Sequence, residues 1–260
     1  MMNSRVTVLL QNCVLFFDDS ATTEIYPLSL TDPLPLLISG GLIGEADWGR
    51  TFDTEALASG EGKRSAKGQA IVSCGPMAEN TVVQVIDPTT KQQLDNGRIG
   101  ELWVSGPGIA SGYWRKRRET KDAFQAVLPG DDRSYLRTGD LGFIMDGHVY
   151  VTGRLKDLII LNGQNVYPQD IERLVGQAVP QLRKGRVAAF QVQGADGPGI
   201  GVAAEVTRLA YRQVGGEAIA DQVCAAITAH YNTAPLVCLL LEPGSLPRTS
   251  SGKIRRSACL

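Results

Sequence analysis

The chain has 260 residues, of which 43% are hydrophobic and 20% are charged. The 26 Lys and Arg residues balance 27 Asp and Glu residues, so the formal net charge at pH 7 is -1. This length predicts one or two domains with ample core, and the composition excludes an intrinsically disordered chain. A net charge near zero argues against a general electrostatic attraction to nucleic acid or to an anionic membrane, although it leaves room for local basic clusters.

Five cysteines and two histidines are spread along the chain, and no Cys-x-x-Cys pair occurs. The odd number and wide spacing of the cysteines predict neither a zinc site nor a disulfide framework, and we expect a cytoplasmic protein. The apolar run Val6–Phe17 is interrupted by Gln11 and Asn12. It is shorter than the roughly 20 residues that span a bilayer, so it predicts a buried strand. A signal peptide is the alternative, but Asp18 and Asp19 stand where its cleavage region would be.

Residues 1–45 show little regular pattern, because Pro27, Pro33 and Pro35 exclude a long helix through this apolar segment. Residues 48–69 are polar and glycine-rich, which predicts a loop with one short helix.

A β-rich region follows this loop. Residues 81–87 and 100–105 alternate as strands do, and Asn96-Gly97 between them is a favoured hairpin turn. A second hairpin is predicted over residues 143–151, with Asp146-Gly147 at its turn. Four aromatic residues are interpreted as core of a β-barrel rather than as groups that stack on a ligand: Trp103, Tyr113, Trp114 and Phe143.

After Gly153 the pattern changes to short strands that alternate with amphipathic helices. The predicted strands cover residues 158–161, 186–193, 201–206 and 236–241, and the predicted helices cover 169–177, after Pro168, and 218–231. The order β-α-β-β-α-β describes a small α+β layer of roughly 100 residues.

Four segments with chemically active residues follow one another along the chain. They are Gly100-Glu-Leu-Trp-Val-Ser-Gly-Pro-Gly-Ile-Ala-Ser-Gly-Tyr113, Arg137-Thr-Gly-Asp-Leu-Gly142, Gly153-Arg-Leu-Lys-Asp-Leu-Ile-Ile160 and Leu246-Pro-Arg-Thr-Ser-Ser-Gly-Lys-Ile-Arg-Arg256. This series resembles the adenylate-forming (AMP-binding) superfamily, which includes acyl- and aryl-CoA ligases, luciferases and peptide-synthetase adenylation domains. With residues 165–172 and 246–259 added, the chain is most similar to the fatty acyl-AMP ligase branch, over about residues 70–260.

The resemblance implies an α+β fold in which the β-barrel-type end of a large adenylation domain precedes a small C-terminal lid domain. Residues 1–45 would be a degenerate or poorly assigned remnant of the large domain. Residues 46–155 would be its β-rich end, and residues 156–260 the lid.

Asp140 and Arg154 are the candidate nucleotide-binding residues. Asp140 follows a glycine in a predicted turn, where its carboxylate can accept two hydrogen bonds from the vicinal hydroxyls of a ribose. An Asx turn, in which the carboxylate bonds its own backbone, is the alternative. Arg154 stands at a strand end, where its guanidinium either reaches ribose or phosphate oxygens or lies in solvent. The resemblance implies that both residues hold the nucleotide of ATP and of acyl-AMP.

Lys156 lies where the β-rich region meets the small α+β layer. The resemblance implies that it is the hinge about which the lid rotates, and an ordinary exposed lysine is the alternative. Gly163 belongs to the Asn162-Gly163 turn, which in related CoA ligases borders the channel of the thiol acceptor. Gln164 and Val166 depart from the family here, because fatty acyl-AMP ligases typically carry Arg and His at these positions.

Lys253 follows Thr249-Ser-Ser-Gly252, a polar segment that we expect to be flexible enough for the ammonium group to enter a cleft. A mobile cation between an attacking carboxylate and the α-phosphate stabilises the transition state of adenylation more than the ground state. The resemblance implies that Lys253 is the catalytic lysine of this half-reaction. A Walker phosphate loop is excluded, because Pro247 and Ile254 stand where its Gly and Ser/Thr are needed. A nucleic-acid patch is the other alternative, although no aromatic residue separates its basic members Arg248, Lys253, Arg255 and Arg256.

The chain also departs from the pattern of this family. Members carry a phosphate loop and most of the acyl pocket in several hundred residues ahead of these segments, and this chain has no such loop. The segment Leu36–Gly41 fits the family, but Ser29 and Pro33 stand where its Tyr-Gly-x-x-Glu sequence places Tyr and Glu. Since that glutamate normally helps to hold Mg²⁺ and proline has no side-chain oxygen, the usual magnesium ligand is not matched. We therefore expect a truncated chain that is not fully active alone.

The expected function is ATP-dependent activation of a carboxylate, most of all a fatty acid, as acyl-AMP, followed by transfer to an acyl carrier protein. ATP and Mg²⁺ are the expected cofactors, and neither a nucleic-acid partner nor a membrane span is expected. Two alternatives stay open. In the first, the chain is a non-catalytic half of a split enzyme, or a pseudoenzyme, and binds a separate chain that supplies the N-terminal half. In the second, it is part of an acyl-CoA ligase or of a peptide-synthetase adenylation domain.

Overall fold

The computed structural model describes residues 8–10, 13–15, 49–195, 197–249 and 252–259. The chain divides into two compact units, Met1–Leu155 and Lys156–Leu260. Both units combine sheets with helices, which confirms the predicted α+β class. Among the described residues, no helix has both the length and the apolar character needed to cross a bilayer.

The first described elements are two short strands, β1 (Val8–Leu10) and β2 (Cys13–Leu15), which pair antiparallel where the sequence predicted one strand. The Leu36–Gly41 segment, Ser29 and Pro33 lie outside the described residues.

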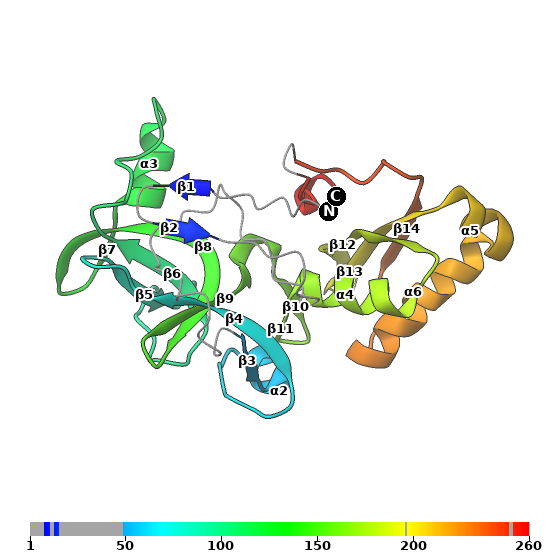
Figure 1. Cartoon of the computed structure of the whole chain (residues 1–260), viewed down its shortest axis with the longest axis horizontal. Helices are drawn as coiled ribbons and strands as arrows, with labels where there is room; N and C mark the ends of the chain where they lie inside the picture. The colour runs from blue at the N-terminus through cyan, green and yellow to red at the C-terminus, as the bar shows by residue number, and fades with distance from the viewer. Residues whose placement is uncertain (1–7, 11–12, 16–48, 196, 250–251, 260) are drawn as a thin grey trace, which may run out of the picture. The chain divides into compact units, whose positions relative to one another are not determined.

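A seven-stranded sheet forms the centre of the first unit, in the order β3-β4-β9-β8-β6-β5, with β7 paired to β8 (Figure 1). Every pairing in it is antiparallel. Among the described strands the outermost two, β3 and β5, do not pair with each other, so the sheet is open rather than the predicted barrel. Its strands are β3 (Gly49–Phe52), β4 (Gln69–Pro76), β5 (Val82–Ile86), β6 (Gly100–Ser105), β7 (Ala126–Leu128), β8 (Asp131–Met145) and β9 (His148–Arg154).

Two helices of this unit lie among the described residues. The short helix α2 (Thr54–Ala58) confirms the one predicted within residues 48–69, and it begins where the side chain of Asp53 accepts a hydrogen bond from the N–H of Ala56. Helix α3 (Arg117–Phe124) has no buried residue.

The β8–β9 hairpin confirms the prediction for residues 143–151. Phe143 lies opposite Tyr150, their rings stack with centroids 5.0 Å apart, and both side chains are fully buried. Asp146 and Gly147 have φ angles of 50° and 76°, which a two-residue turn of this twist requires.

The β5–β6 pairing is also confirmed. Asn96 and Gly97 form a turn, as predicted, in which the N–H of Arg98 donates to the carbonyl of Asp95 over 3.1 Å, but this turn does not join the two strands directly. The side chain of Asp87 accepts hydrogen bonds from the N–H groups of Thr89 and Thr90, which turns the chain directly after β5. Gly97 lies further along the connection, where its N–H donates to the carbonyl of Ile144. The loop therefore runs from residue 87 to residue 99.

Of the four aromatic residues assigned to the core, Trp103 and Phe143 are buried. Tyr113 and Trp114 are 53% and 86% exposed, so the prediction is wrong for these two. Both follow β6 in a segment that leaves the sheet, and so their side chains lie beyond the layer that would cover them.

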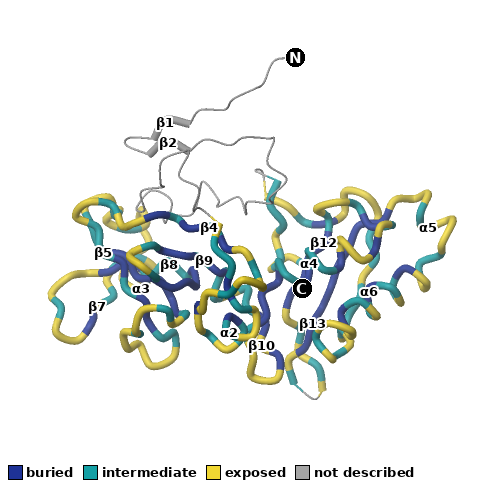
Figure 2. The backbone as a smooth tube through the Cα atoms, turned by 60° about the horizontal axis from the view of Figure 1, so that its bottom comes forward, coloured by how far each residue is buried: buried dark blue, intermediate teal, exposed yellow. Residues whose placement is uncertain are grey.

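A three-stranded sheet forms the centre of the second unit, with β12 and β13 antiparallel and β13 and β14 parallel. Helices α4 and α6 cover one face of this sheet, and Figure 2 shows that strands β12 and β13 are largely buried. Alternate residues of β12 face opposite sides, so Val187 and Ala189 pack with these helices, and Ala188 and Phe190 pack with Leu246. The elements are β10 (Ile159–Leu161), β11 (Gln164–Val166), α4 (Pro168–Ala178), β12 (Leu182–Gly194), β13 (Gly197–Val206), α5 (Arg208–Val214), α6 (Gly216–Tyr231) and β14 (Val237–Leu241).

Candidate functional site

Asp140 lies inside β8, at a point where the strand bulges. On β6, Glu101 and Trp103 are two residues apart, yet their partners on β8, Leu141 and Arg137, are four apart. Three residues of β8, Asp140 among them, therefore lie opposite a single residue of β6. Bulges commonly re-aim a side chain next to a functional site. The turn predicted here is in fact a bulge within a continuous strand.

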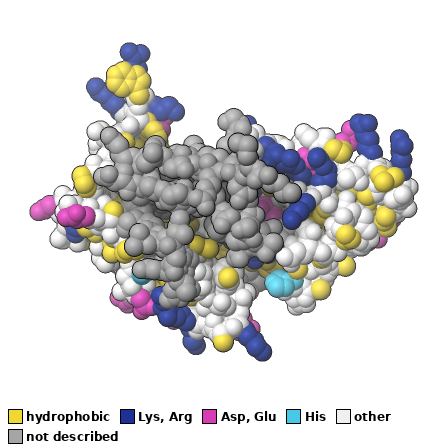
Figure 3. All heavy atoms as spheres, viewed as in Figure 1, with side chains coloured by type: hydrophobic (Ala, Val, Ile, Leu, Met, Phe, Trp, Pro, Cys, Tyr) yellow, Lys and Arg dark blue, Asp and Glu magenta, His cyan; other side chains and the backbone are white. Residues whose placement is uncertain are grey.

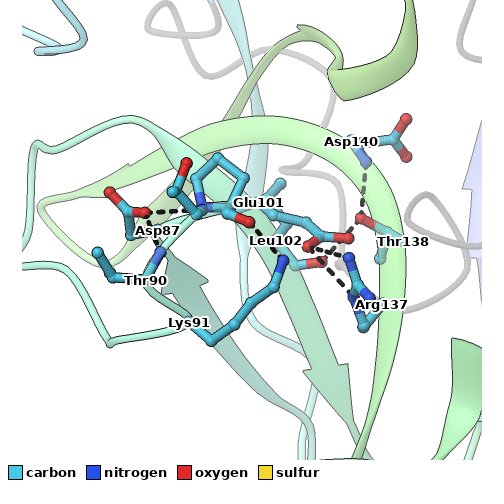
Figure 4. A network of polar contacts seen from close by, with 10 residues as sticks. Asp87, Thr90, Lys91, Glu101, Leu102, Arg137, Thr138 and Asp140 are labelled. Atoms are coloured by element: carbon cyan, nitrogen blue, oxygen red, sulfur yellow. Dashed lines mark hydrogen bonds and ion pairs between the residues drawn. The ribbon is translucent and has the colours of Figure 1, made fainter. Parts of the chain in front are cut away.

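Thr138 and Gly139 fix this bulge. The hydroxyl of Thr138 donates to the carbonyl of Leu102 over 2.8 Å and accepts from the N–H of Asp140 over 3.0 Å. Gly139 has a φ of +71°, which side chains rarely allow. Figure 4 shows the carboxyl group of Asp140 directed away from Thr138. Thr138 and Gly139 thus shape the backbone at the bulge. The carboxylate of Asp140 is the group of this motif that is left to take part in binding or chemistry.

Asp140 and Arg154 are brought together by the pairing of β8 with β9, in which they are direct partners. Nε of Arg154 lies 3.0 Å from Oδ1 of Asp140. The Asp140 side chain is only 6% exposed, whereas that of Arg154 is 38% exposed. A carboxylate offers about four lone-pair positions. Asp140 can therefore accept hydrogen bonds from hydroxyl groups while the guanidinium balances its charge.

Arg137, in the same motif, has a structural role that sequence reasoning did not assign. Its Nη2 lies 3.0 Å from Oε2 of Glu101, a residue only 1% exposed, and its guanidinium lies 5.7 Å from the ring centroid of Trp103. These contacts tie β8 to β6 beside the bulge, as Figure 4 shows for the pair with Glu101. The sequence offered a signal for this role, since Arg137 and Glu101 both belong to the segments that resemble the AMP-binding family.

Lys156 and Gly163 lie in the second unit. Lys156 is exposed, in a 3₁₀ turn (Leu155–Asp157), and is the first residue of this unit. Gly163 is exposed at the turn between β10 and β11, where Asn162 and Gly163 have φ angles of 50° and 78°. Gln164 begins β11 directly after this turn.

Lys253 stands at the end of a closed backbone turn. The N–H of Thr249 donates to the carbonyl of Lys253 over 2.8 Å, and the N–H of Lys253 donates to the Thr249 hydroxyl over 3.0 Å. Arg248 and Ile254 form a β-bridge directly outside these two residues. The described backbone on either side of this turn is therefore joined by hydrogen bonds. Residues 250–251 lie outside the described part, and the flexibility expected of the segment stays a prediction.

The turn that carries Lys253 is anchored at both ends by carboxylates. Before it, the N–H of the buried Leu246 donates to Oε1 of Glu205 over 3.0 Å. Burial opposes ionisation of Glu205, but backbone hydrogen bonds from Gly244 and Leu246 and the guanidinium of Arg183 outweigh it and hold its pKa below the usual range. After the turn, Arg256 binds Glu172.

The alternative of a nucleic-acid patch is weakened by the same contacts. Arg256 is engaged with Glu172 and also lies 3.3 Å from Oδ2 of Asp157. One of the four cations of that patch is thus half-buried and already paired with two carboxylates.

The described residues include no group of three His, Cys, Asp or Glu side chains that would hold a metal ion. Two open surface hollows lie in the first unit, and the residues that line them include neither Asp140 nor Arg154.

Residues 54–114 match the family model of AMP-binding enzymes. The chain is 39% identical over 190 residues to the medium-chain-fatty-acid–acyl-carrier-protein ligase JamA of Moorena producens, an alignment that covers 73% of this chain and 32% of JamA. It is 36% identical over 220 residues to the long-chain-fatty-acid–AMP ligase FadD32 of Mycobacterium marinum, covering 73% of this chain and 35% of that ligase.

A solved structure from work on the fatty acyl-adenylate ligases of E. coli and L. pneumophila has the same fold, with a TM-score of 0.61 and 27% identity. The likeness covers 79% of this chain and 36% of that one. The chain spans about a third of the length of the curated relatives it matches.

Proposed function

Because this chain belongs to the AMP-binding, adenylate-forming enzymes and is similar to part of the fatty acyl-AMP ligases, we propose that it takes part in activating a fatty acid with ATP. In the first step a carboxylate oxygen attacks the α-phosphorus of ATP, pyrophosphate leaves, and acyl-AMP forms. In the second step a thiol sulfur attacks the acyl carbon, and AMP leaves. The observation that carries this proposal is the buried carboxylate of Asp140, paired with Arg154 at a strand bulge.

Asp140 is proposed to accept hydrogen bonds from the ribose hydroxyls of ATP and of acyl-AMP. Its low exposure supports this role, because hydrogen bonds to a charged group are stronger away from bulk water. Arg154 balances the charge of this carboxylate, and its partly exposed guanidinium is available to contact ribose or phosphate oxygens.

Lys253 is proposed as the catalytic lysine of the adenylation step, where its ammonium group would stabilise the charge that gathers on the carboxylate and the α-phosphate. The closed turn between Thr249 and Lys253 supports this role, since a group that is positioned beforehand stabilises a transition state without reorganisation. Lys156, at the first residue of the second unit, is proposed as the hinge, and Gly163 as part of the border of the acceptor channel.

ATP is a substrate in this proposal, and Mg²⁺ is expected to accompany its phosphates. The residues that the structure describes supply no cluster of ligands for the ion, and no magnesium ligand is assigned to them.

The acceptor is proposed to be the thiol of an acyl carrier protein, as the name of the JamA relative states for that protein. CoA is the second candidate, because another relative, FadD21 of Mycobacterium tuberculosis, is named a fatty-acid–CoA ligase and is 39% identical over 227 residues. The release of acyl-AMP to a carrier protein, measured against formation of a CoA thioester, distinguishes the two.

The test is ATP–pyrophosphate exchange with fatty acids of increasing length. It is run on this chain alone and on the chain mixed with the N-terminal two thirds of the M. marinum relative, since the chain matches about one third of that ligase. We expect exchange in the mixture, and we expect Lys253→Ala to lower it roughly 10²–10³-fold, the effect of losing one preorganised charge. Arg255→Gln, which removes a neighbouring exposed cation, should leave the rate unchanged.

Exchange that is equal in the Lys253→Ala and unmodified proteins would remove the catalytic assignment. If the chain binds the N-terminal part firmly and no carboxylate supports exchange, the chain is instead a non-catalytic, partner-binding module.

A further inference from the structure

The first unit carries a projecting segment with a highly exposed aromatic side chain. Trp114 is 86% exposed, and it lies in residues 112–124, which run into helix α3 and which we call the α3 projection. Figure 3 shows hydrophobic and basic side chains together on the projecting part that Figure 1 labels α3. None of the residues of α3 is buried, so this helix adds nothing to the core.

The α3 projection is nevertheless an ordered structure. The hydroxyl of Thr120 accepts a hydrogen bond from the N–H of Tyr113 over 2.9 Å and closes the turn. A Cβ at Gly112 would lie 2.1 Å from Cγ2 of Thr120, so only glycine fits there. The ring of Tyr113 packs edge-on against Phe124, with centroids 5.1 Å apart. Trp114 follows directly and is left outside this packing.

The α3 projection carries five cations in addition to the exposed indole. Only two acidic residues, Glu119 and Asp122, lie among them, and within the described part of the chain none of the five forms an ion pair. The guanidinium of Arg115 lies 5.6 Å from the ring centroid of Trp114. All of these basic side chains are exposed: Arg115, Lys116, Arg117, Arg118 and Lys121.

We propose that the α3 projection binds the surface of an anionic lipid bilayer, with Trp114 among the lipid headgroups and the five cations on their phosphates. Tryptophan favours the bilayer interface, where its ring is in an apolar region and its N–H stays hydrated. Each Lys or Arg held near an anionic bilayer strengthens binding about fivefold, and an aromatic ring at the interface adds buried apolar area to this electrostatic attraction. Because the whole chain has a net charge of -1, this attraction is local.

A bilayer fits this surface better than an acidic protein or a nucleic acid does. A stable protein interface takes roughly 20–30 residues on each side, more than the α3 projection offers. Single-stranded nucleic acid needs successive aromatic platforms, whereas Tyr113 is packed on Phe124 and only Trp114 is free of the turn. A headgroup layer, by contrast, accommodates an amphipathic aromatic ring together with neighbouring cations.

The test is flotation of the full chain with vesicles of phosphatidylcholine alone and of phosphatidylcholine with about 30 mol% phosphatidylglycerol. We expect binding to the anionic vesicles only, and its loss in about 0.5 M NaCl, where surface charges are screened. Arg115→Gln combined with Arg117→Gln and Arg118→Gln should weaken binding about 100-fold, from three losses of about fivefold each. The control variant removes three exposed cations of the second unit, by Lys184→Gln, Arg208→Gln and Arg212→Gln, and should bind as the unmodified chain does.

Trp114 is tested separately, by the blue shift of tryptophan fluorescence on vesicle binding. The measurement uses a Trp48→Phe background, so that Trp103, which is 4% exposed and is not expected to respond, is the other tryptophan present. The shift should disappear in Trp114→Phe, and circular dichroism should be unchanged, because no residue of α3 is buried.

Equal loss of binding in the two triple variants would overturn the proposal, since the attraction would then be non-specific. Failure of the chain to bind either kind of vesicle would also overturn the proposal. This holds even if the chain bound polyglutamate or single-stranded DNA through the same three arginines.

Discussion

Arg256 and Glu172 form a two-pronged ion pair, with Nε 2.7 Å from Oε1 and Nη2 2.8 Å from Oε2. The same guanidinium lies 3.3 Å from Oδ2 of Asp157. One side chain, three residues after Lys253, thus ties the C-terminal segment to helix α4 and to the residue next to Lys156. Within the second unit, the guanidinium of Arg256 thus links the segment that carries the proposed catalytic residue Lys253 to the turn that carries the proposed hinge residue Lys156.

Breaking this pair should destabilise the protein. Removal of one partner from a buried ion pair costs about 3–5 kcal/mol. Since the Arg256 and Glu172 side chains keep 23% and 14% exposure, we expect Arg256→Ala to lower the free energy of unfolding by about 2–3 kcal/mol, measured by urea denaturation. Arg255→Gln, next to it but exposed, is the control and should stay within about 0.5 kcal/mol of the unmodified chain. Equal stability of the two variants would show that the ion pair contributes nothing.

Some of the elements predicted correctly have a strong signal within a few neighbouring residues. Asp146-Gly147 defines its turn by backbone preference alone, and Pro168 marks the start of α4 because proline suits a first helical turn. Helix α5 and strand β11 were missed: no residue of α5 is buried, and β11 is only three residues long, so neither has an apolar period to read.

The features that sequence reasoning could not supply depend on residues far apart in the chain. The bulge at Asp140 arises from the pairing of β8 with β6. Arg137 and Glu101, which join these two strands, are 36 residues apart in the sequence. Arg256 and Glu172 are separated by 84 residues, and nothing local links them. Trp114 was assigned to the core because tryptophan is usually well buried, a tendency that a projecting turn overrides.

The depressed pKa of Glu205 predicts that stability falls in acid. Its carboxylate is 1% exposed, and the hydrogen bonds and the Arg183 guanidinium that favour its ionised form lower its pKa from the ordinary value of 4.5. The stabilisation is therefore complete above about pH 4.5 and is lost as the pH falls through the lowered value in the folded protein. We expect urea midpoints to drop from pH 5 to pH 3 less steeply in Glu205→Gln than in the unmodified chain.

Glu242→Gln is the matched control for this experiment. Glu242 is 77% exposed and its partner, Arg208, lies 3.7 Å away, so this variant should keep the acid dependence of the unmodified chain. An identical slope in all three proteins would contradict the role of Glu205.

The two glycines of the Arg137–Gly142 segment predict a graded effect of alanine. A Cβ at Gly142 would lie 2.3 Å from the backbone carbonyl oxygen of Tyr150, so β8 and β9 must move apart, at a cost of about 3 kcal/mol or more. A Cβ at Gly139 meets no atom within 4 Å, and only its φ of +71° opposes alanine, by about 1–2 kcal/mol. Urea denaturation should rank Gly142→Ala below Gly139→Ala in stability, and the reverse order would show that backbone conformation outweighs the close approach.

Asp140→Asn should weaken nucleotide binding while preserving the fold. Asparagine has nearly the same shape but no charge, and a hydrogen bond to a charged group contributes about 1.5–3 kcal/mol, so we expect AMP affinity to fall about 10–100-fold. NMR titration of the chain with AMP measures this change. Asp146→Asn, at the 60%-exposed aspartate of the neighbouring turn, is the matched control and should bind AMP normally.

A second ligand makes this assignment specific to the ribose. An AMP analogue without the 2′ and 3′ hydroxyls should bind the unmodified chain as weakly as AMP binds Asp140→Asn, because each change removes one side of the same hydrogen bonds. The variant should then bind AMP and the analogue equally. If the variant still discriminates between the two ligands by the full factor, the hydroxyls are held by other residues, and the pairing of Asp140 with Arg154 serves only to join β8 to β9.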